Sequence, residues 1–330
     1  MLEWVGALKI RHTDLFLDSR EPRALSFISH AHGDHIESHD VAIATPATAA
    51  LTGHRIPLKA VTELDYNVQH HLDPQTTLRL LPAGHVLGSA MLHVTRAEGT
   101  LLYTGDFKLQ RCLTVPCAAP VRADVLVMES TYGRPVFRFP PRERVVEQLV
   151  DLVSGAMAAG RQPVVLGYSL GKSQEAARVL TDAGFNVTLH GAAHALCEIY
   201  ETLGVPLGRL RRYRREDFHG PAALDLRERG ALVGPPHVAR TSFVTAFDNP
   251  LRVVLTGWAV LKDAKYRYGV DHALPLSDHA DFDELLELVD IVRPRKVYTH
   301  HGYRAFADEL RTRGIDAEPA CPDSQLSLFE

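Results

Sequence analysis

One short segment restricts what this chain can fold into more than any other: residues 30–35, which read His-Ala-His-Gly-Asp-His. The segment follows an apolar run at residues 24–29 that is typical of a buried strand. Because side chains on a strand alternate between its faces, His30 and His32 point to the same side, and Asp34 and His35 follow past the turn. Imidazole and carboxylate ligands at this spacing indicate a site for two zinc, manganese or iron ions, which is typical of metal-assisted hydrolysis.

A two-ion site needs ligands from other loops, and three further strand ends offer them. His85 follows an apolar run in the segment Pro-Ala-Gly-His, where the glycine allows a sharp turn of the backbone. Asp106 ends another run and offers a carboxylate, the ligand type best suited to bridging two cations. The adjacent His300 and His301 end the last apolar run and supply a final imidazole.

Two of these assignments carry alternatives. A lone histidine such as His85 is more often a hydrogen-bonded structural residue, but here it accompanies the cluster at residues 30–35 and the strand end at Asp106. Asp18 ends an apolar run before the cluster, and we predict that it orients a ligand histidine through the second nitrogen of that ring. The alternative is an aspartate that only initiates a turn, and Asp14 is a weaker candidate for the same role.

The pattern of the whole chain predicts a mixed α/β class with layered sheets. Composition is ordinary for a globular protein, with 45% hydrophobic and 23% charged residues among 330. Strands and turns dominate the first 130 residues, whereas strands and helices alternate afterwards. The helix expected at residues 143–159 has an apolar side, which consists of Val146, Leu149, Val150, Val153 and Met157.

Domain boundaries are predicted from composition and from the spacing of the polar clusters. The proline-rich stretch at residues 134–142 reads as a linker. Polar clusters resembling the N-terminal site reappear at His279 and His301, so we expect the chain to return to its first domain. The predicted domains are residues 1–140, an insertion at residues 141–255 and a return segment at residues 256–330.

Composition also bears on location. The four cysteines form no CxxC pair and no dense framework, which fits a reducing compartment and predicts a cytoplasmic protein. No apolar run approaches the roughly 20 residues that span a bilayer. The first residues lack the features of a signal peptide, so we expect neither export nor a membrane anchor.

Two segments suggest contact with an anionic polymer, although the formal net charge is -4. Arginines surround Tyr213, so Arg211, Arg212 and Tyr213 could hold phosphates and stack a base; a solvated arginine face is the equal alternative. Residues 167–175, between a strand and a helix, place Ser169, Gly171 and Lys172 as an anion cradle. Their spacing differs from that of a P-loop, and a plain helix-start loop is the alternative.

The order of these motifs resembles a known family. Asp18, the segment at residues 30–35, His85 and Asp106 look like the successive motifs of the metallo-β-lactamase fold. Residues 128–133 and 276–281, with His301 and the glycine after it, resemble the three further motifs of the β-CASP nucleases. The resemblance implies an αββα metallo-β-lactamase sandwich with an inserted α/β β-CASP domain. Within this group, residues 82–90 are similar to the bacterial ligase-associated DNA exonuclease family.

The resemblance also implies roles for single residues. One metal ion would be held by His30, His32 and His85, the other by Asp34, His35 and His301, with Asp106 as the bridge between them. The two ions would be divalent, with zinc as the first choice and manganese as the alternative. His279 would donate the proton to the leaving alkoxide, oriented by Glu129, and Asp34 also counts among the catalytic groups. The alternative for His279 is a cap of the helix that begins near Asp281, although Asp278 is the better cap. Residues 167–175 look like the β-CASP segment that holds a terminal 5'-phosphate in related DNA nucleases.

The function that these features favour is a metal-dependent nuclease, and the resemblance makes it an exonuclease on single-stranded DNA in repair or processing. An RNA-processing ribonuclease is the near alternative, because both polymers present the same phosphodiester. A small-molecule hydrolase of thioesters or lactams is a different class, against which the inserted domain argues. By family resemblance, the expected partners are single-stranded nucleic acid and a DNA ligase or helicase, without a membrane.

Overall fold

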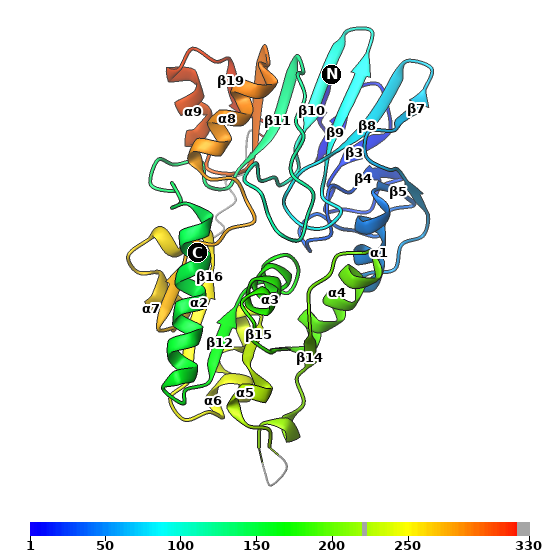
Figure 1. The fold of residues 1–330 in the computed structure, drawn as a ribbon. Helices are drawn as coiled ribbons and strands as arrows, with labels where there is room; N and C mark the ends of the chain where they lie inside the picture. Colours follow the sequence, from blue (N-terminus) through cyan, green and yellow to red (C-terminus); the bar gives the residue numbers. More distant parts are fainter. Residues whose placement is uncertain (220–222, 322–330) are drawn as a thin grey trace. The chain divides into compact units, whose positions relative to one another are not determined.

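The computed structural model describes residues 1–219 and 223–321, and their contacts group the chain into two units (Figure 1). Unit 1 combines residues 1–137 with the segment from residue 279 onward. Unit 2 consists of residues 138–278. The chain therefore leaves the first unit and returns to it.

The two boundaries compare differently with the sequence prediction. The first lies between Phe137 and Arg138, inside the proline-rich linker. The second lies after Asp278, whereas the sequence placed the return near residue 256. The difference has a physical reason: β16 (Leu251–Leu255) pairs in parallel with β17 (His272–Leu274), so backbone hydrogen bonds keep this stretch in the sheet of unit 2.

Unit 1 is built on two sheets within the described residues. The first has the strand order β1-β2-β3-β4-β5-β6, and the second has the order β19-β18-β11-β10-β9-β8-β7. The strands of the first sheet are β1 (Leu2–Trp4), β2 (Leu8–Ile10), β3 (Leu15–Leu17), β4 (Leu25–Phe27), β5 (Val41–Ala44) and β6 (Val61–Glu63). Those of the second are β7 (Gln69–Asp73), β8 (Thr76–Pro82), β9 (Ala90–Arg96), β10 (Gly99–Tyr103), β11 (Val125–Ser130), β18 (Lys296–Gly302) and β19 (Ala317–Pro319).

Period-two alternation of apolar side chains explains the layers of unit 1. In β10, Leu101 and Tyr103 join a core shared with the first sheet, where they meet residues such as Phe27. The intervening Leu102 points the other way, into a second core with helices α8 (Phe282–Val292) and α9 (Ala305–Thr312). With α1 (Pro46–Arg55) beside β6, helices flank paired sheets, which is the αββα arrangement that the resemblance implied.

Unit 2 contains a parallel sheet with the strand order β14-β13-β15-β12-β16-β17 among its described residues. Its remaining strands are β12 (Pro163–Leu166), β13 (Val187–Leu189), β14 (Leu210–Arg212) and β15 (Ala231–Gly234). The helical segments are α2 (Arg142–Ala158), α3 (Lys172–Asp182), α4 (Gly191–Thr202), α5 (Leu226–Arg229), α6 (Ser242–Thr245) and α7 (Ala264–Tyr268), with short 3-10 turns η1 (Arg215–Asp217), η2 (Pro236–Arg240) and η3 (Gly257–Val260). Every residue of β12 and β15 is buried, as expected for strands covered on both faces.

The helix predicted at residues 143–159 is α2, which ends just before Gly160. Leu149 and Val153 are buried as the apolar pattern predicted. The buried side is completed by Val145 and Ala156, whereas the sequence favoured Val146, Val150 and Met157, which are only half-buried. Among the described residues, no helix is both long enough and apolar enough to cross a membrane.

Candidate metal centre

Strand direction brings the predicted ligands to one edge of the second sheet. Strands β10, β11 and β18 run parallel, and β8 runs in the same direction because two antiparallel pairings separate it from β10. The carboxyl ends of these strands therefore meet at one edge. His85, Asp106 and His301 lie at or just after the ends of β8, β10 and β18.

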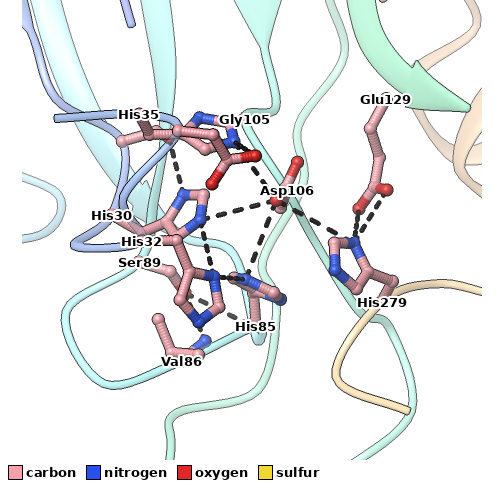
Figure 2. A network of polar contacts seen from close by, with 12 residues as sticks. His30, His32, His35, His85, Val86, Ser89, Gly105, Asp106, Glu129 and His279 are labelled. Atoms are coloured by element: carbon pink, nitrogen blue, oxygen red, sulfur yellow. Dashed lines mark hydrogen bonds and ion pairs between the residues drawn. The ribbon is translucent and has the colours of Figure 1, made fainter. Parts of the chain in front are cut away.

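The structure gathers the predicted metal ligands into two groups. The first group is His30, His32, His85 and Asp106; the second is Asp34, His35 and His301. Within each group, the candidate ligand atoms lie within 4.8 Å of one another. Figure 2 shows Asp106 between the imidazoles of the first group and His279. Of the two adjacent histidines that end β18, it is His301 that belongs to the second group.

Ring nitrogens converge in the first group. Nδ1 of His32 lies 3.1 Å from Nε2 of His30 and 3.0 Å from Nε2 of His85. The Oδ2 atom of Asp106 lies 3.4 Å and 3.8 Å from the same two Nε2 atoms. A cluster of imidazole nitrogens with one carboxylate oxygen is a donor set that suits a tetrahedral zinc ion.

The second group leaves a buried nitrogen facing carboxylates. Nε2 of His35 lies 3.3 Å from Oδ2 of Asp106 and 3.7 Å from Oδ2 of Asp34. Within residues 1–219 and 223–321, no partner lies at a distance and angle suitable for a hydrogen bond to this Nε2 atom. The ring of His301 stacks on that of His35, with centroids 4.6 Å apart. A buried ring nitrogen beside two carboxylate oxygens fits a divalent cation that displaces the proton, and Asp106 lies within reach of both groups.

Asp18 contacts one of these candidate ligands. Its Oδ2 lies 2.8 Å from Nδ1 of His35 and accepts a hydrogen bond of 2.7 Å from the hydroxyl of Tyr103. An ionised carboxylate only accepts hydrogen bonds, so His35 carries a proton on Nδ1, and its Nε2 atom is the one that faces Asp106. This is the contact expected of a carboxylate that fixes a ligand histidine.

Ser29 extends the same control to a second ligand, and the sequence reasoning missed it. Its hydroxyl donates to Oδ2 of Asp18 over 2.6 Å and lies 3.0 Å from Nδ1 of His30, whose proton it accepts. Asp18 thereby fixes the tautomer of His35 directly and that of His30 through Ser29. The available signal was a small hydroxyl residue directly before the first ligand. Gly105 (φ +53°) leaves space for the Ser29 side chain, because a Cβ at this position would lie 2.5 Å from it.

Burial and neighbouring charges set the protonation states of the centre. Burial, reinforced by His35, holds the pKa of His30 well below its usual value, and the same two causes lower the pKa of His301 to about 4. Burial alone would raise the pKa of Asp106, but His35 and His279 pull it well below its usual value. Burial alone would lower the pKa of His35, but Asp106 and Asp18 raise it well above its usual range. A cation would compete with that proton on His35.

A histidine–glutamate pair lies beside Asp106. Nδ1 of His279 is 3.0 Å and 3.2 Å from the two carboxylate oxygens of Glu129, and 3.9 Å from Oδ2 of Asp106 (Figure 2). Glu129 is buried in β11 and also accepts the backbone N–H of Phe107 over 2.7 Å. Burial raises the pKa of Glu129, although His279 opposes the shift.

The helix cap that the sequence considered for His279 or Asp278 belongs to neither. The side chain of Asp281 accepts the backbone N–H groups of Asp283 and Glu284 at the start of α8. Glu284 returns its carboxylate to the N–H of Asp281 over 3.1 Å, which completes a capping box. With the cap supplied by Asp281, the contact of His279 with Glu129 needs another explanation.

Glycines shape the loop that carries His85. Gly84 has a φ of +78°, and a Cβ there would lie 2.1 Å from the backbone oxygen of Lys108. The hydroxyl of Ser89 accepts the backbone N–H of His85 over 3.2 Å (Figure 2). The sharp turn that the sequence predicted at Gly84 is therefore present, and it leaves no space for a side chain.

In unit 2, the predicted anion cradle is partly closed by its own contacts. Lys172 is buried and forms an ion pair with Asp278, and its ammonium lies 4.9 Å from the ring centre of Tyr168. The N–H of Gly171 donates to the side chain of Gln174 over 2.7 Å. Ser169 is half-buried. The lysine charge is thus already paired within unit 2.

The arginine-rich segment also differs from its prediction. Arg211 and Arg212 are exposed on and at the end of β14, as a phosphate-binding surface requires. The ring of Tyr213, however, stacks on Phe218 with centroids 4.9 Å apart and meets Phe243 at 4.8 Å. It packs against the apolar core of unit 2, so one face of the ring is already covered by Phe218.

Comparisons with known proteins agree with this geometry. A family model described as "Zn-dependent metallo-hydrolase RNA specificity domain" matches residues 265–319. A "Probable DNA ligase" of Opitutus terrae is 38% identical over 317 residues, which are 95% of this chain and 30% of that protein. The "5' exonuclease Apollo" of Gallus gallus is 29% identical over 286 residues, which are 83% of this chain and 57% of that protein. The chain thus spans about a third of the first relative and little more than half of the second.

Shorter and more distant matches extend the group. The "Transcription termination factor FttA" of Methanothermobacter thermautotrophicus is 35% identical over 129 residues, which are 38% of this chain and 20% of that protein. A crystal structure of a protein of unknown function from Enterococcus faecalis V583 shares the fold, with a TM-score of 0.54 at 17% identity. That match covers 84% of this chain and 75% of the other.

Proposed function

Because the chain belongs to the β-CASP family of metallo-β-lactamase-fold nucleases, we propose that it is a metal-dependent nuclease acting on single-stranded nucleic acid. The observation that carries the proposal is the convergence of two ligand groups on Asp106, with His279 and Glu129 beside it. A hydrolase of small molecules uses the ligands but has no evident need for this additional acid–base pair.

The donor set supports two divalent cations. Zinc is the first choice because the ligands are imidazoles and carboxylates and because the matching family model is described as zinc-dependent. Manganese is the alternative, since carboxylates also suit it. When bound, two such cations would lower the pKa of a coordinated water to near neutrality and would offset negative charge on phosphoryl oxygens.

The protein's own groups supply proton transfer. The carboxylate of Glu129 accepts a hydrogen bond from Nδ1–H of His279, which leaves Nε2 to carry the second proton of the imidazolium. From Nε2 this proton passes to the oxygen that leaves the phosphorus. Glu129 is a positioning residue that also favours the charged form of His279.

We propose DNA as the substrate and 5' exonuclease action as the mode, supported by relatives named as a DNA ligase and a 5' exonuclease. RNA is the second candidate, since the matching domain is described by RNA specificity and another relative is an "Endoribonuclease ysh1". The ligase-named relative also supports a DNA ligase as a partner in repair. The proposed location is the cytoplasm, on the basis of the cysteine pattern.

One assay tests the proposal. Protein with its metal content measured is given end-labelled single-stranded DNA, single-stranded RNA and a thioester, with chelator, zinc and manganese varied. We expect cleavage of a nucleic acid that chelator abolishes and zinc or manganese restores. Chelator-resistant cleavage would refute the metal mechanism, and turnover of the thioester alone would replace the nuclease with a small-molecule hydrolase.

A further inference from the structure

A cavity of about 160 Å³ opens in unit 1 next to the second ligand group. Asp18 and His301 line one side of it, and the β1–β2 hairpin lines another through Trp4. Its floor is apolar, because Leu8 and Leu17 also line it and are themselves buried. The cavity therefore adjoins the second ligand group through His301.

Trp4 is unusual in its position. It ends β1, which is the outermost strand of its sheet, and it is 40% exposed. The neighbouring Val5, at the tip of the hairpin, is 51% exposed. An indole left half open at the wall of a cavity offers a flat apolar face that an unstacked ring can cover.

Arg20 gives the cavity a positive group at a fixed place. Its Nε donates to the backbone oxygen of Asp34 over 3.0 Å, and its Nη2 lies 3.7 Å from Oδ2 of the same residue. Half of the Arg20 side chain remains exposed. A guanidinium tethered on one side and open on the other suits a phosphate, which it can bind with two parallel hydrogen bonds.

We propose that this cavity binds one nucleotide of the substrate strand, with its base against the indole of Trp4 and its phosphate beside Arg20. The proposal rests on the nuclease function and adds a subsite to it. A base can occupy the cavity only after leaving its neighbours, which costs least in a single strand. Stacking on an aromatic ring tolerates any base, so the subsite selects unpaired strands without selecting sequence.

The first test compares substrates that do and do not offer a base. We expect Trp4→Ala to lower kcat/KM for a single-stranded oligonucleotide about tenfold more than for bis(p-nitrophenyl) phosphate, mainly through KM. Trp4→Phe should restore most of the loss. Val5→Ala alters the same hairpin tip without touching the cavity wall, and it should behave as the wild type. Equal losses on both substrates would overturn the proposal.

A single abasic position, moved stepwise along the oligonucleotide, locates the base. At one position we expect the missing base to lower kcat/KM of the wild type as much as Trp4→Ala does. At the same position, the missing base should not lower kcat/KM of the Trp4→Ala variant any further. If the loss in kcat/KM from Trp4→Ala and the loss from the abasic position multiplied at every position, the contact between Trp4 and a base would be overturned.

Binding can be tested even if the wild type cleaves no nucleic acid. The chain has two tryptophans, so Trp258→Phe leaves Trp4 as the only one. In zinc-loaded protein that also carries His279→Ala to prevent turnover, single-stranded DNA should quench Trp4 emission, and an abasic site at the mapped position should weaken the quenching. Unchanged emission with DNA bound would refute the subsite, whereas absent cleavage by the wild type bears on the nuclease function alone.

Discussion

At the scale of single residues, one carboxylate contacts two candidate ligand histidines. Asp18 acts on His35 through a direct hydrogen bond and on His30 through Ser29. Asp18 was predictable, because a carboxylate at a strand end before a histidine cluster is a known pattern. Ser29 and Tyr103 were not, because a hydroxyl shows no metal chemistry until its neighbours in space are known.

Asp18→Asn should weaken metal binding without removing a ligand. The amide cannot accept all the hydrogen bonds that Ser29, His35 and Tyr103 donate to the carboxylate, so we expect zinc affinity to fall about 10- to 100-fold. Competition with a chromophoric chelator measures the zinc affinity. Asp14→Asn, at an exposed site nearby, is the matched control and should leave affinity unchanged. An equal affinity in both variants would show that Asp18 has no orienting role.

His279→Ala tests the proton donor. Loss of a positioned general acid should lower kcat about 10²- to 10⁴-fold on an oligonucleotide, while the metal content stays the same. Glu129→Gln should cost less and should shift the pH profile of kcat, because Glu129 acts through His279. If His279→Ala turned over near the wild-type rate, His279 would have a purely structural role.

At the scale of elements, the sequence was informative where a residue acts within its own loop. The Gly84 turn is such a case, and so are the buried strands that precede each ligand. The sequence was uninformative where the partner of a side chain lies far away along the chain. Lys172 pairs with a carboxylate 106 residues further along the chain, and the ring of Tyr213 is held by Phe218 and Phe243. Without those partners in view, both looked available to a nucleic acid.

Gly84→Ala should destabilise the loop that carries His85. A positive φ costs a residue with a Cβ about 1–2 kcal/mol, and the overlap with the oxygen of Lys108 adds to it. Urea unfolding should therefore show a loss of about 2 kcal/mol or more. Gly53→Ala is the matched control: it lies within α1 with open space around it and should gain about 0.5 kcal/mol. A stable Gly84→Ala variant with normal zinc affinity would contradict the tight turn.

Lys172→Met tests whether Lys172 stabilises the structure or binds a phosphate. Removing one partner of a buried ion pair should cost unit 2 about 3 kcal/mol, whereas Arg178→Met, which breaks an exposed pair on the same helix, should cost about 0.5 kcal/mol or less. Strands with a 5'-phosphate and a 5'-hydroxyl give the second measurement. We expect Lys172→Met to keep the wild-type ratio of their rates; loss of a preference for the 5'-phosphate would return the lysine to the anion cradle.

At the scale of the whole molecule, the sequence predicted an insertion but not where it ends. The polar motif around His279 marked the return, and the strand β17 before it carried no signal of which sheet it joins. A strand of three residues is too short for its apolar pattern to identify a partner strand. Its parallel neighbour β16 decided the boundary.

Metal should stabilise one unit selectively, because all candidate ligands of both groups lie in unit 1. A ligand at 1,000 times its Kd adds about 4 kcal/mol, which raises the Tm of a unit of this size by about 10 °C. Calorimetry with and without chelator should show one transition that moves and one that does not. Lys172→Met should lower the other transition only; a common shift of both would show that the units unfold together.

The second sheet of unit 1 is completed by β18 and β19, which are the last strands of the described residues to be synthesised. Strand β18 sits beside β11 in the interior of its sheet, and it brings His301, while His279 arrives just ahead of it. On the ribosome, the chain must therefore be made as far as residue 301 before the last of the seven candidate ligands, His301, exists. A nascent chain that stalls within unit 2 lacks both His301 and His279, so the full set of candidate ligands exists only after unit 2 has been synthesised.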